Sequence, residues 1–231
     1  MTADREVYVQ AVALGLDPAW RRLDDACRVA DGEALIAAES ESAAAGVRTL
    51  VYSSVGLEPV VDLVLLRLAG SLDELEAAGA RLARTGLGRW LNVRHSLLGR
   101  IAPSHYVTKP SAQERSVLDG DPAQYLIVYP FTKSTDWYLL GREVRQGVMN
   151  EHMKVGRGYP TVRQLLAYSF GLDDGDFLVA YDTDDLAAFG ELVRELRGTE
   201  SRRSTVSDRP ILIGIHHELD AVVALLGGAP A

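Results

Sequence analysis

An internal repeat constrains the fold of this chain more strongly than any other feature of its sequence. Residues 48–57 (RTLVYSSVGL) are echoed by residues 163–172 (RQLLAYSFGL), with the Tyr-Ser pairs matched as Tyr52-Ser53 and Tyr168-Ser169. Each copy is followed by a second apolar run and then by a helix start, where a hydroxyl residue precedes acidic ones. Such a hydroxyl is a preferred helix N-cap, and acids in the first turn suit the helix dipole. Because the two copies share one pattern, we expect them to have the same fold.

Hydrophobic periodicity predicts the same order of elements in both halves. In the first half we expect strands at 6–13, 48–56, 60–68 and 94–101, and helices at 18–43 and 72–85. In the second half we expect strands at 124–131, 163–170, 176–182 and 205–215, and helices at 139–155 and 184–197. The order βαββαβ is that of the ferredoxin-like plait.

The repeat therefore predicts an α+β fold made of tandem ferredoxin-like halves. The N-terminal half spans residues 1–101, the C-terminal half spans 124–231, and the proline-containing stretch 102–123 connects them as a loop. An antiparallel sheet that is covered by helices on one face leaves its other face free. We expect the two free faces to pack into a barrel-like core, a dimeric α+β barrel, and the C-terminal half to carry the site.

Composition excludes several classes of protein. The chain has 231 residues, of which 47% are hydrophobic, so it can bury a sizeable core. Its net charge of −8 gives no diffuse cationic surface for nucleic acid or an anionic membrane. Cys27 is the single cysteine, which rules out internal disulfides, thiolate zinc sites and iron–sulfur clusters. Without a secretory signal or an apolar run of membrane-spanning length, we expect a cytoplasmic protein.

One histidine lies in an informative position. On the predicted helix 139–155, Val144, Val148, His152 and Val155 recur at helical spacing, so His152 is expected on the buried apolar face. A core histidine bonded to a backbone carbonyl is the commoner explanation. A neutral imidazole in an apolar wall is also what a heme iron requires of its proximal ligand. Spacing alone does not separate the two.

A tyrosine and a lysine stand near the end of one predicted strand. Tyr125, Ile127 and Tyr129 share one face of the strand, and Lys133 follows four residues after Tyr129. A phenol and an ammonium could thus reach one site, although a tyrosine that caps the core is the commoner case. Trp137, which opens the next helix, is interpreted as a packing residue.

Taken together, the motifs of this chain resemble the chlorite dismutase family, in its coproheme decarboxylase branch. The matching segments of the second half are residues 129–133 (YPFTK), 136–140 (DWYLL), 150–152 (NEH), 156–160 (GRGYP) and 168–174 (YSFGLDD). Those of the first half are 47–49 (VRT), 52–57 (YSSVGL) and 84–89 (RTGLGR). Each motif is weak alone, but their order and spacing are specific and cover nearly the whole chain.

The resemblance implies roles for five residues. His152 matches the proximal iron ligand, and Tyr129 matches the tyrosine that becomes a radical and abstracts hydrogen from a propionate. Lys133 matches a lysine that contacts this propionate, and Arg115 matches an arginine that binds another one. Gln164 matches the distal-pocket position, which is arginine in chlorite dismutases and glutamine in many decarboxylases.

Some positions stay open. The gap between the proximal ligand and the distal position is one residue shorter than in the family, so Arg163 is an alternative to Gln164 in the pocket. At the place of a distal histidine in related proteins, this chain has Ala112, with His105 nearby. Near the last strand, neither Arg203 nor Ser204 is assigned to a propionate.

The implied activity is heme-dependent oxidation. With hydrogen peroxide, two propionates of iron coproporphyrin III (coproheme) would be decarboxylated to give heme b, so that the porphyrin is both cofactor and substrate. The implied assembly is a homopentamer, with a ferrochelatase acting upstream. Two alternatives remain: a catalytically silent heme-binding carrier or structural protein, and a chlorite dismutase or peroxidase.

Overall fold

The computed structural model describes residues 6–102 and 120–228. The chain divides into two compact units, one made of Met1–Arg100 together with Leu212–Ala231 and one made of Ile101–Ile211. They are called unit 1 and unit 2 below. Within the described residues, no helix combines the length and the apolar character that crossing a membrane requires.

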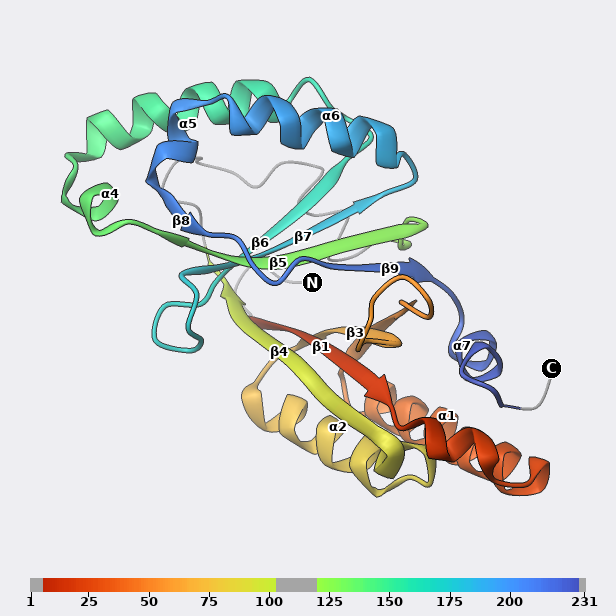
Figure 1. Cartoon of the computed structure of the whole chain (residues 1–231). Coiled ribbons are helices and arrows are strands. Elements are labelled where there is room, and N and C mark those ends of the chain that lie inside the picture. The colour runs from red at the N-terminus through yellow and green to blue at the C-terminus, as the bar shows by residue number, and fades with distance from the viewer. Residues whose placement is uncertain (1–5, 103–119, 229–231) are drawn as a thin grey trace. The chain divides into compact units, whose positions relative to one another are not determined.

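Unit 1 contains a five-stranded antiparallel arrangement with two long helices (Figure 1). Its elements are β1 (Val7–Leu16), η1 (Pro18–Arg22), α1 (Asp25–Ala44), β2 (Arg48–Ser53), β3 (Leu63–Ala69), α2 (Leu72–Arg84), η2 (Leu87–Trp90), β4 (Leu91–Ile101), β9 (Leu212–His216) and α7 (Leu219–Leu225). The strands lie in the order β4-β1-β3-β2-β9. Ser71 caps α2 through a hydrogen bond from the amide of Glu74, as the N-cap pattern predicts.

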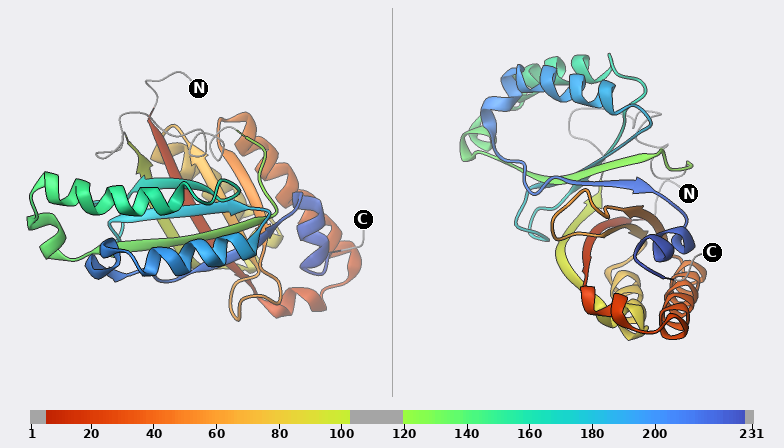
Figure 2. Two further views of the ribbon diagram at one scale, coloured as in Figure 1. Left: turned by 90° about the horizontal axis from the view of Figure 1, so that it is seen from above. Right: turned by 45° about the vertical axis from the view of Figure 1, so that its right-hand side comes forward.

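Unit 2 repeats this plan. Its elements are β5 (Tyr125–Lys133), α4 (Thr135–Leu139), α5 (Arg142–Gly156), β6 (Arg163–Tyr168), β7 (Phe177–Thr183), α6 (Leu186–Arg197), η3 (Glu200–Ser204) and β8 (Thr205–Ser207). The strands lie in the order β6-β7-β5-β8, and each pair is antiparallel. Figure 2 shows α5 and α6 running side by side over one face of this sheet. If the strands of each half are numbered one to four, both units have the order 4-1-3-2, so the predicted α+β fold is confirmed.

The register of the strands aligns the two copies residue by residue. Thr49 faces Arg67 across β2 and β3, and Gln164 faces Tyr181 across β6 and β7. The turns that follow also agree, because Gly56 and Gly171 have φ angles of 74° and 71°. Positive φ is the conformation for which glycine is the favoured residue.

The match of the Tyr-Ser pairs was off by one residue. The amide of Ser54 donates to Asp62 O, and the amide of Ser169 donates to Asp176 O, so these two serines are equivalent. Ser53, which the sequence paired with Ser169, therefore corresponds to Tyr168. The repeated Tyr-Ser pair suggested an alignment of the two copies that is shifted by one residue, and the hydrogen bonds of the turn give the correct one.

Two predicted helices start later than expected. The range 18–43 contains η1 and then α1, whose N-cap Asp24 accepts a hydrogen bond from the amide of Cys27; periodicity had merged these two elements. The range 139–155 begins at Leu139, the last residue of α4, whereas α5 begins only after Gly141.

The single strand predicted at 205–215 is wrong. It is divided into β8 and β9, with Pro210 between them, and proline has no amide hydrogen to donate to a ladder. β9 pairs with β2 through Tyr52–His216 and Ser53–Ile215, so it extends the sheet of unit 1. The helix α7 that follows was not predicted. The packing of the two predicted halves into a barrel-like core stays a prediction.

Candidate functional site

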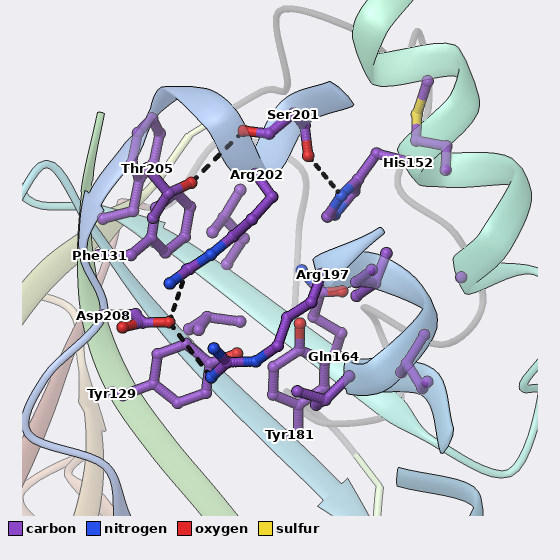
Figure 3. A pocket seen from close by; sticks show the side chains of 18 of the residues that line it. Tyr129, Phe131, His152, Gln164, Tyr181, Arg197, Ser201, Arg202, Thr205 and Asp208 are labelled. Carbon is purple, nitrogen blue, oxygen red and sulfur yellow. Dashed lines mark hydrogen bonds and ion pairs between the residues drawn. The ribbon is translucent and has the colours of Figure 1, made fainter. Parts of the chain in front are cut away.

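Unit 2 holds a cavity of about 370 Å³ between the helix-covered face of its sheet and the helices α5 and α6 (Figure 3). Ligand pockets usually measure about 300–1,000 Å³ and are mainly apolar with a few polar groups. Ile127, Tyr129 and Phe131 of β5 point into this cavity, as expected for alternate residues on one face of a strand.

The structure brings four of the five predicted site residues to this cavity: Tyr129, Lys133, His152 and Gln164. The fifth, Arg115, lies outside the described residues, as do Ala112 and His105. Arg163 is not among the residues that line the cavity; its guanidinium forms an ion pair with Asp182. Neighbouring strand residues point to opposite faces, so the position facing the cavity is occupied by Gln164.

His152 is held by a hydroxyl group. Its Nδ1 lies 3.1 Å from the Oγ of Ser201, a residue that is only 4% exposed (Figure 3). Among the described residues, Nε2 of His152 has no hydrogen-bond partner. Burial lowers the pKa of His152 to about 4, with the positive charge of Lys133 adding to the effect and Glu151 opposing it. The imidazole is therefore neutral at neutral pH, with one nitrogen oriented by the protein.

The helix face around His152 differs from the predicted one. No residue of α5 is buried, and Val144 is 55% exposed. Instead, Met149, Met153 and Gly156 line the cavity with His152. Met149 and Gly156 lie three and four positions from His152, so they share its face, and Met153 is its neighbour in the sequence. The valine spacing had selected the neighbouring face of the helix.

Lys133 is tied to the same segment as His152. Its Nζ donates to the backbone oxygen of Ser201 at 2.9 Å and to Oγ1 of Thr205 at 3.0 Å. It also lies 4.8 Å from the centre of the ring of Trp137, a favourable position for a cation. Burial lowers the pKa of Lys133 to about 8, and the charge of Arg202 contributes. The lysine is thus still mostly charged at pH 7.

Tyr129 lies against a second tyrosine. The rings of Tyr129 and Tyr181 are stacked with their centres 6.0 Å apart, and Tyr181 is only 4% exposed. Burial raises the pKa of Tyr129; Asp208 also raises it, while Arg197 and Arg202 lower it. Burial likewise raises the pKa of Tyr181. Both phenols therefore keep their protons at neutral pH.

Sequence reasoning missed an ion-pair group at the cavity wall. Arg197 and Arg202 both contact the Oδ2 of Asp208, at 3.7 Å and 2.7 Å (Figure 3). The periodicity of α6 carried a signal for Arg197, since Leu192, Val193, Leu196 and Arg197 all line the cavity. Arg203, one of the two residues left open near the last strand, is 81% exposed and pairs with Glu200.

The cavity is cationic although the chain is acidic. Four basic residues are among the described residues that line it, together with a single acid, Asp208; the basic residues are Lys133, Arg157, Arg197 and Arg202. Such a wall attracts anions, carboxylates in particular, through charge-assisted hydrogen bonds.

The groups that line the cavity fit a metal ion that is already bound by another ligand, such as a porphyrin. Within the described residues, no group of three or more His, Cys, Asp or Glu side chains is placed to hold a metal ion. His152 alone, with its neutral imidazole, offers one nitrogen to the cavity. A porphyrin supplies the other ligands of its iron, and its propionates match the cationic wall. One imidazole nitrogen and a cationic wall thus form a set of groups that fits an anionic metalloporphyrin.

Comparisons with known proteins identify the family. The model of the family described as chlorite dismutase matches residues 27–217, so this chain belongs to the chlorite dismutase family. It is 29% identical over 209 residues to the coproheme decarboxylase of Mycolicibacterium smegmatis, covering 88% of this chain and 87% of that protein.

Solved structures agree. A mutant chlorite dismutase from Candidatus Nitrospira defluvii has a TM-score of 0.88 and 26% identity, covering 97% of each chain. The chlorite dismutase from the same organism in complex with imidazole has a TM-score of 0.86 and 26% identity, covering 96% of this chain and 95% of that one. The family assigned from the motifs is confirmed, and the relatives connect the chain to heme chemistry.

Proposed function

We propose that this chain is a peroxide-dependent coproheme decarboxylase. In each of two rounds, one propionate of iron coproporphyrin III, one hydrogen peroxide and one proton would give a vinyl group, one carbon dioxide and two water molecules. The product would be heme b. The observation that carries the proposal is the meeting of Tyr129, His152 and four cations in one cavity.

The chain's own residues would perform three tasks. His152, oriented by Ser201, would bind the iron through Nε2. Lys133 and the arginines would hold propionates, and burial of the wall would strengthen these pairs. The bound iron porphyrin, once oxidised by peroxide, would supply the oxidising equivalents. Tyr129 would lose an electron and its phenolic proton, and its radical would then take a hydrogen atom from a propionate.

Gln164 favours this reaction over chlorite cleavage. Chlorite and hypochlorite are anions, which a distal cation would hold, and the amide of Gln164 carries no charge. Arg163 is engaged by Asp182 instead. The similarity to chlorite dismutase structures keeps chlorite cleavage as the second candidate.

A single titration separates the candidates. The purified chain is mixed with iron coproporphyrin III, hydrogen peroxide is added in steps, and the porphyrin is analysed by mass spectrometry. Two successive losses of carbon dioxide and hydrogen support decarboxylation. A bound but unchanged porphyrin indicates a silent heme-binding protein, and oxygen release from chlorite indicates a chlorite dismutase.

Two variants test the residue roles. Tyr129→Phe should lower the decarboxylation rate at least about 100-fold while the Soret band of the complex is kept, because the ring remains but its hydroxyl is lost. Turnover at the wild-type rate would refute the radical role. His152→Ala should abolish the spectroscopic signature of imidazole ligation, and an unchanged signature would mean that another residue binds the iron.

The proposal extends to the setting of the enzyme. As in the family, we propose a homopentamer in the cytoplasm that receives coproheme from a ferrochelatase. Native mass spectrometry checks the assembly. A monomer at micromolar concentration would contradict it.

A further inference from the structure

Two arginines and one carboxylate form a compact group beside Tyr129. Arg197 ends α6, Arg202 lies in η3, and Asp208 follows β8. Both guanidinium groups contact the same carboxylate oxygen, Oδ2 of Asp208 (Figure 3). All of these side chains line the cavity. The arginines are thus already engaged by an anion that belongs to the protein.

This acid is unexpected in a site for a polyanion. Asp208 is the one acidic residue among the described residues that line the cavity, and its side chain is only 21% exposed. A carboxylate in this place repels every incoming carboxylate. It also satisfies two guanidinium groups that would otherwise face the cavity without an anionic partner.

The neighbourhood of Tyr129 indicates which ligand group would compete with Asp208. Asp208, Arg197 and Arg202 line the same cavity as Tyr129, and their charges act on the ionisation of its phenol. A propionate that reacts with Tyr129 must enter this cavity. A reacting propionate would therefore meet the same two arginines.

We propose that Asp208 is an internal competitor for the reacting propionate: it holds Arg197 and Arg202 until a substrate carboxylate replaces it, and recovers them once that carboxylate is lost. This inference rests on the proposed function, because it takes the tetracarboxylate iron coproporphyrin III as the substrate. A vinyl group cannot bind a guanidinium, so Asp208 regains both arginines after decarboxylation. Asp208 thereby weakens binding of the substrate more than binding of the product. Without this competition the product, which has fewer carboxylates, would be at a larger disadvantage against the substrate; with it, the two affinities are closer.

The test compares two metal-free porphyrins, so that iron ligation by His152 does not contribute. Coproporphyrin III carries four carboxylates and protoporphyrin IX carries two, with vinyl groups in place of the others. Asp208→Asn removes the competing charge and keeps the shape. The ion pair between Arg202 and Asp208 is partly exposed, so the expected effect is moderate. We expect Asp208→Asn to lower the dissociation constant of coproporphyrin III by about two- to tenfold, and that of protoporphyrin IX by less than about twofold. Quenching of porphyrin fluorescence gives both dissociation constants.

Matched variants separate competition from other effects. Asp174→Asn makes the same chemical change at an exposed acid that does not line the cavity and should leave both affinities unchanged. In a background that carries both Arg197→Gln and Arg202→Gln, Asp208→Asn should no longer strengthen binding of coproporphyrin III, since the competition requires these arginines. Thermal unfolding of each variant checks that the fold is kept.

Three results would overturn the inference. Weaker binding of coproporphyrin III by Asp208→Asn would mean that Asp208 positions the arginines for the ligand. An equal gain in affinity for both porphyrins, or a gain that survives the loss of both Arg197 and Arg202, would mean general repulsion. These results leave the proposed function standing. If the wild-type chain binds neither these porphyrins nor iron coproporphyrin III, the proposed function and this inference fail together.

Discussion

Units 1 and 2 share one topology but use it differently. The strand register makes Val12, Leu14 and Leu65 of unit 1 equivalent to Tyr129, Phe131 and Val179 of unit 2. In unit 1 these residues are aliphatic, join a buried cluster with Trp20 and with Leu35 of α1, and also line a hollow beside α2. In unit 2 two of the equivalent residues are aromatic, and all three line the cavity that holds His152.

The helices explain the difference. α1 buries Leu35, Ala38, Glu39 and Ser42 against its surroundings, whereas α5 buries no residue. Most of α5 is charged or polar, so it has little apolar surface to remove from water. A helix that does not close onto its sheet leaves space beneath it.

The charges differ as well. Unit 1 has a hollow of about 590 Å³ beside α2, but its described charged lining residues are Asp73, Glu76 and a buried Arg67. Arg67 is already paired with Glu39. Among the described residues, the lining of the unit 2 cavity has four basic residues and one acid. The two units thus share one topology, and their side chains give unit 1 a buried apolar cluster and unit 2 a cationic cavity.

The largest expected effect concerns the buried pair of unit 1. Glu39→Ala should reduce the free energy of unfolding by about 3–5 kcal/mol, because the Arg67 guanidinium would stay buried without its partner. Urea denaturation measures this loss. The double variant Glu39→Leu with Arg67→Met should recover most of it, since an apolar pair has no charge to desolvate. A loss below about 1 kcal/mol for Glu39→Ala would show that the pair is not buried as described.

A truncation in each helix compares their packing. Leu35→Ala in α1 should cost about 2–4 kcal/mol, because Leu35 is 1% exposed and its removal leaves a cavity in the core. Met149→Ala in α5 should cost less than about 1 kcal/mol, since Met149 already faces a cavity. Equal losses in urea denaturation would contradict the contrast between a packed and an open helix.

The smallest expected effect concerns pH. The pKa of Lys133 is lowered to about 8, so its charge is present below this pH and is lost above it. Affinity for coproporphyrin III should therefore fall by about two- to fivefold between pH 7 and pH 9.5, as one charge-assisted contact is lost. The positive charge that acts on Lys133 belongs to Arg202. Lys133→Met should remove this part of the pH dependence, and an unchanged profile would assign it to another group.

Much of the site was visible in the sequence because it depends on local spacing. Tyr129 and Lys133 belong to one strand, and alternation places Tyr129 with Ile127 on one face. His152 was found on its helix, but the valines indicated the wrong neighbouring face. Spacing shows which residues share a face and not what that face contacts.

The rest depends on long-range packing. The hydroxyl of Ser201 contacts His152, which lies 49 positions earlier in the chain. Lys133, which lies 68 positions before Ser201, donates a hydrogen bond to the backbone oxygen of Ser201. The group formed by Arg197, Arg202 and Asp208 joins three elements. No periodic pattern within one element predicts such encounters, because they are fixed by how the helices pack on the sheet.

By itself, the sequence determined the repeat, the α+β class and the residues with chemical potential, because periodicity and N-cap patterns act over a few positions. The tertiary structure alone decided that α5 buries no residue and lines a cavity, that Gln164 instead of Arg163 faces this cavity, and that β9 joins β2 of unit 1. The physical reason is that burial and charge pairing are properties of surfaces brought together by folding. The same strand positions could therefore become a core in one unit and a site in the other.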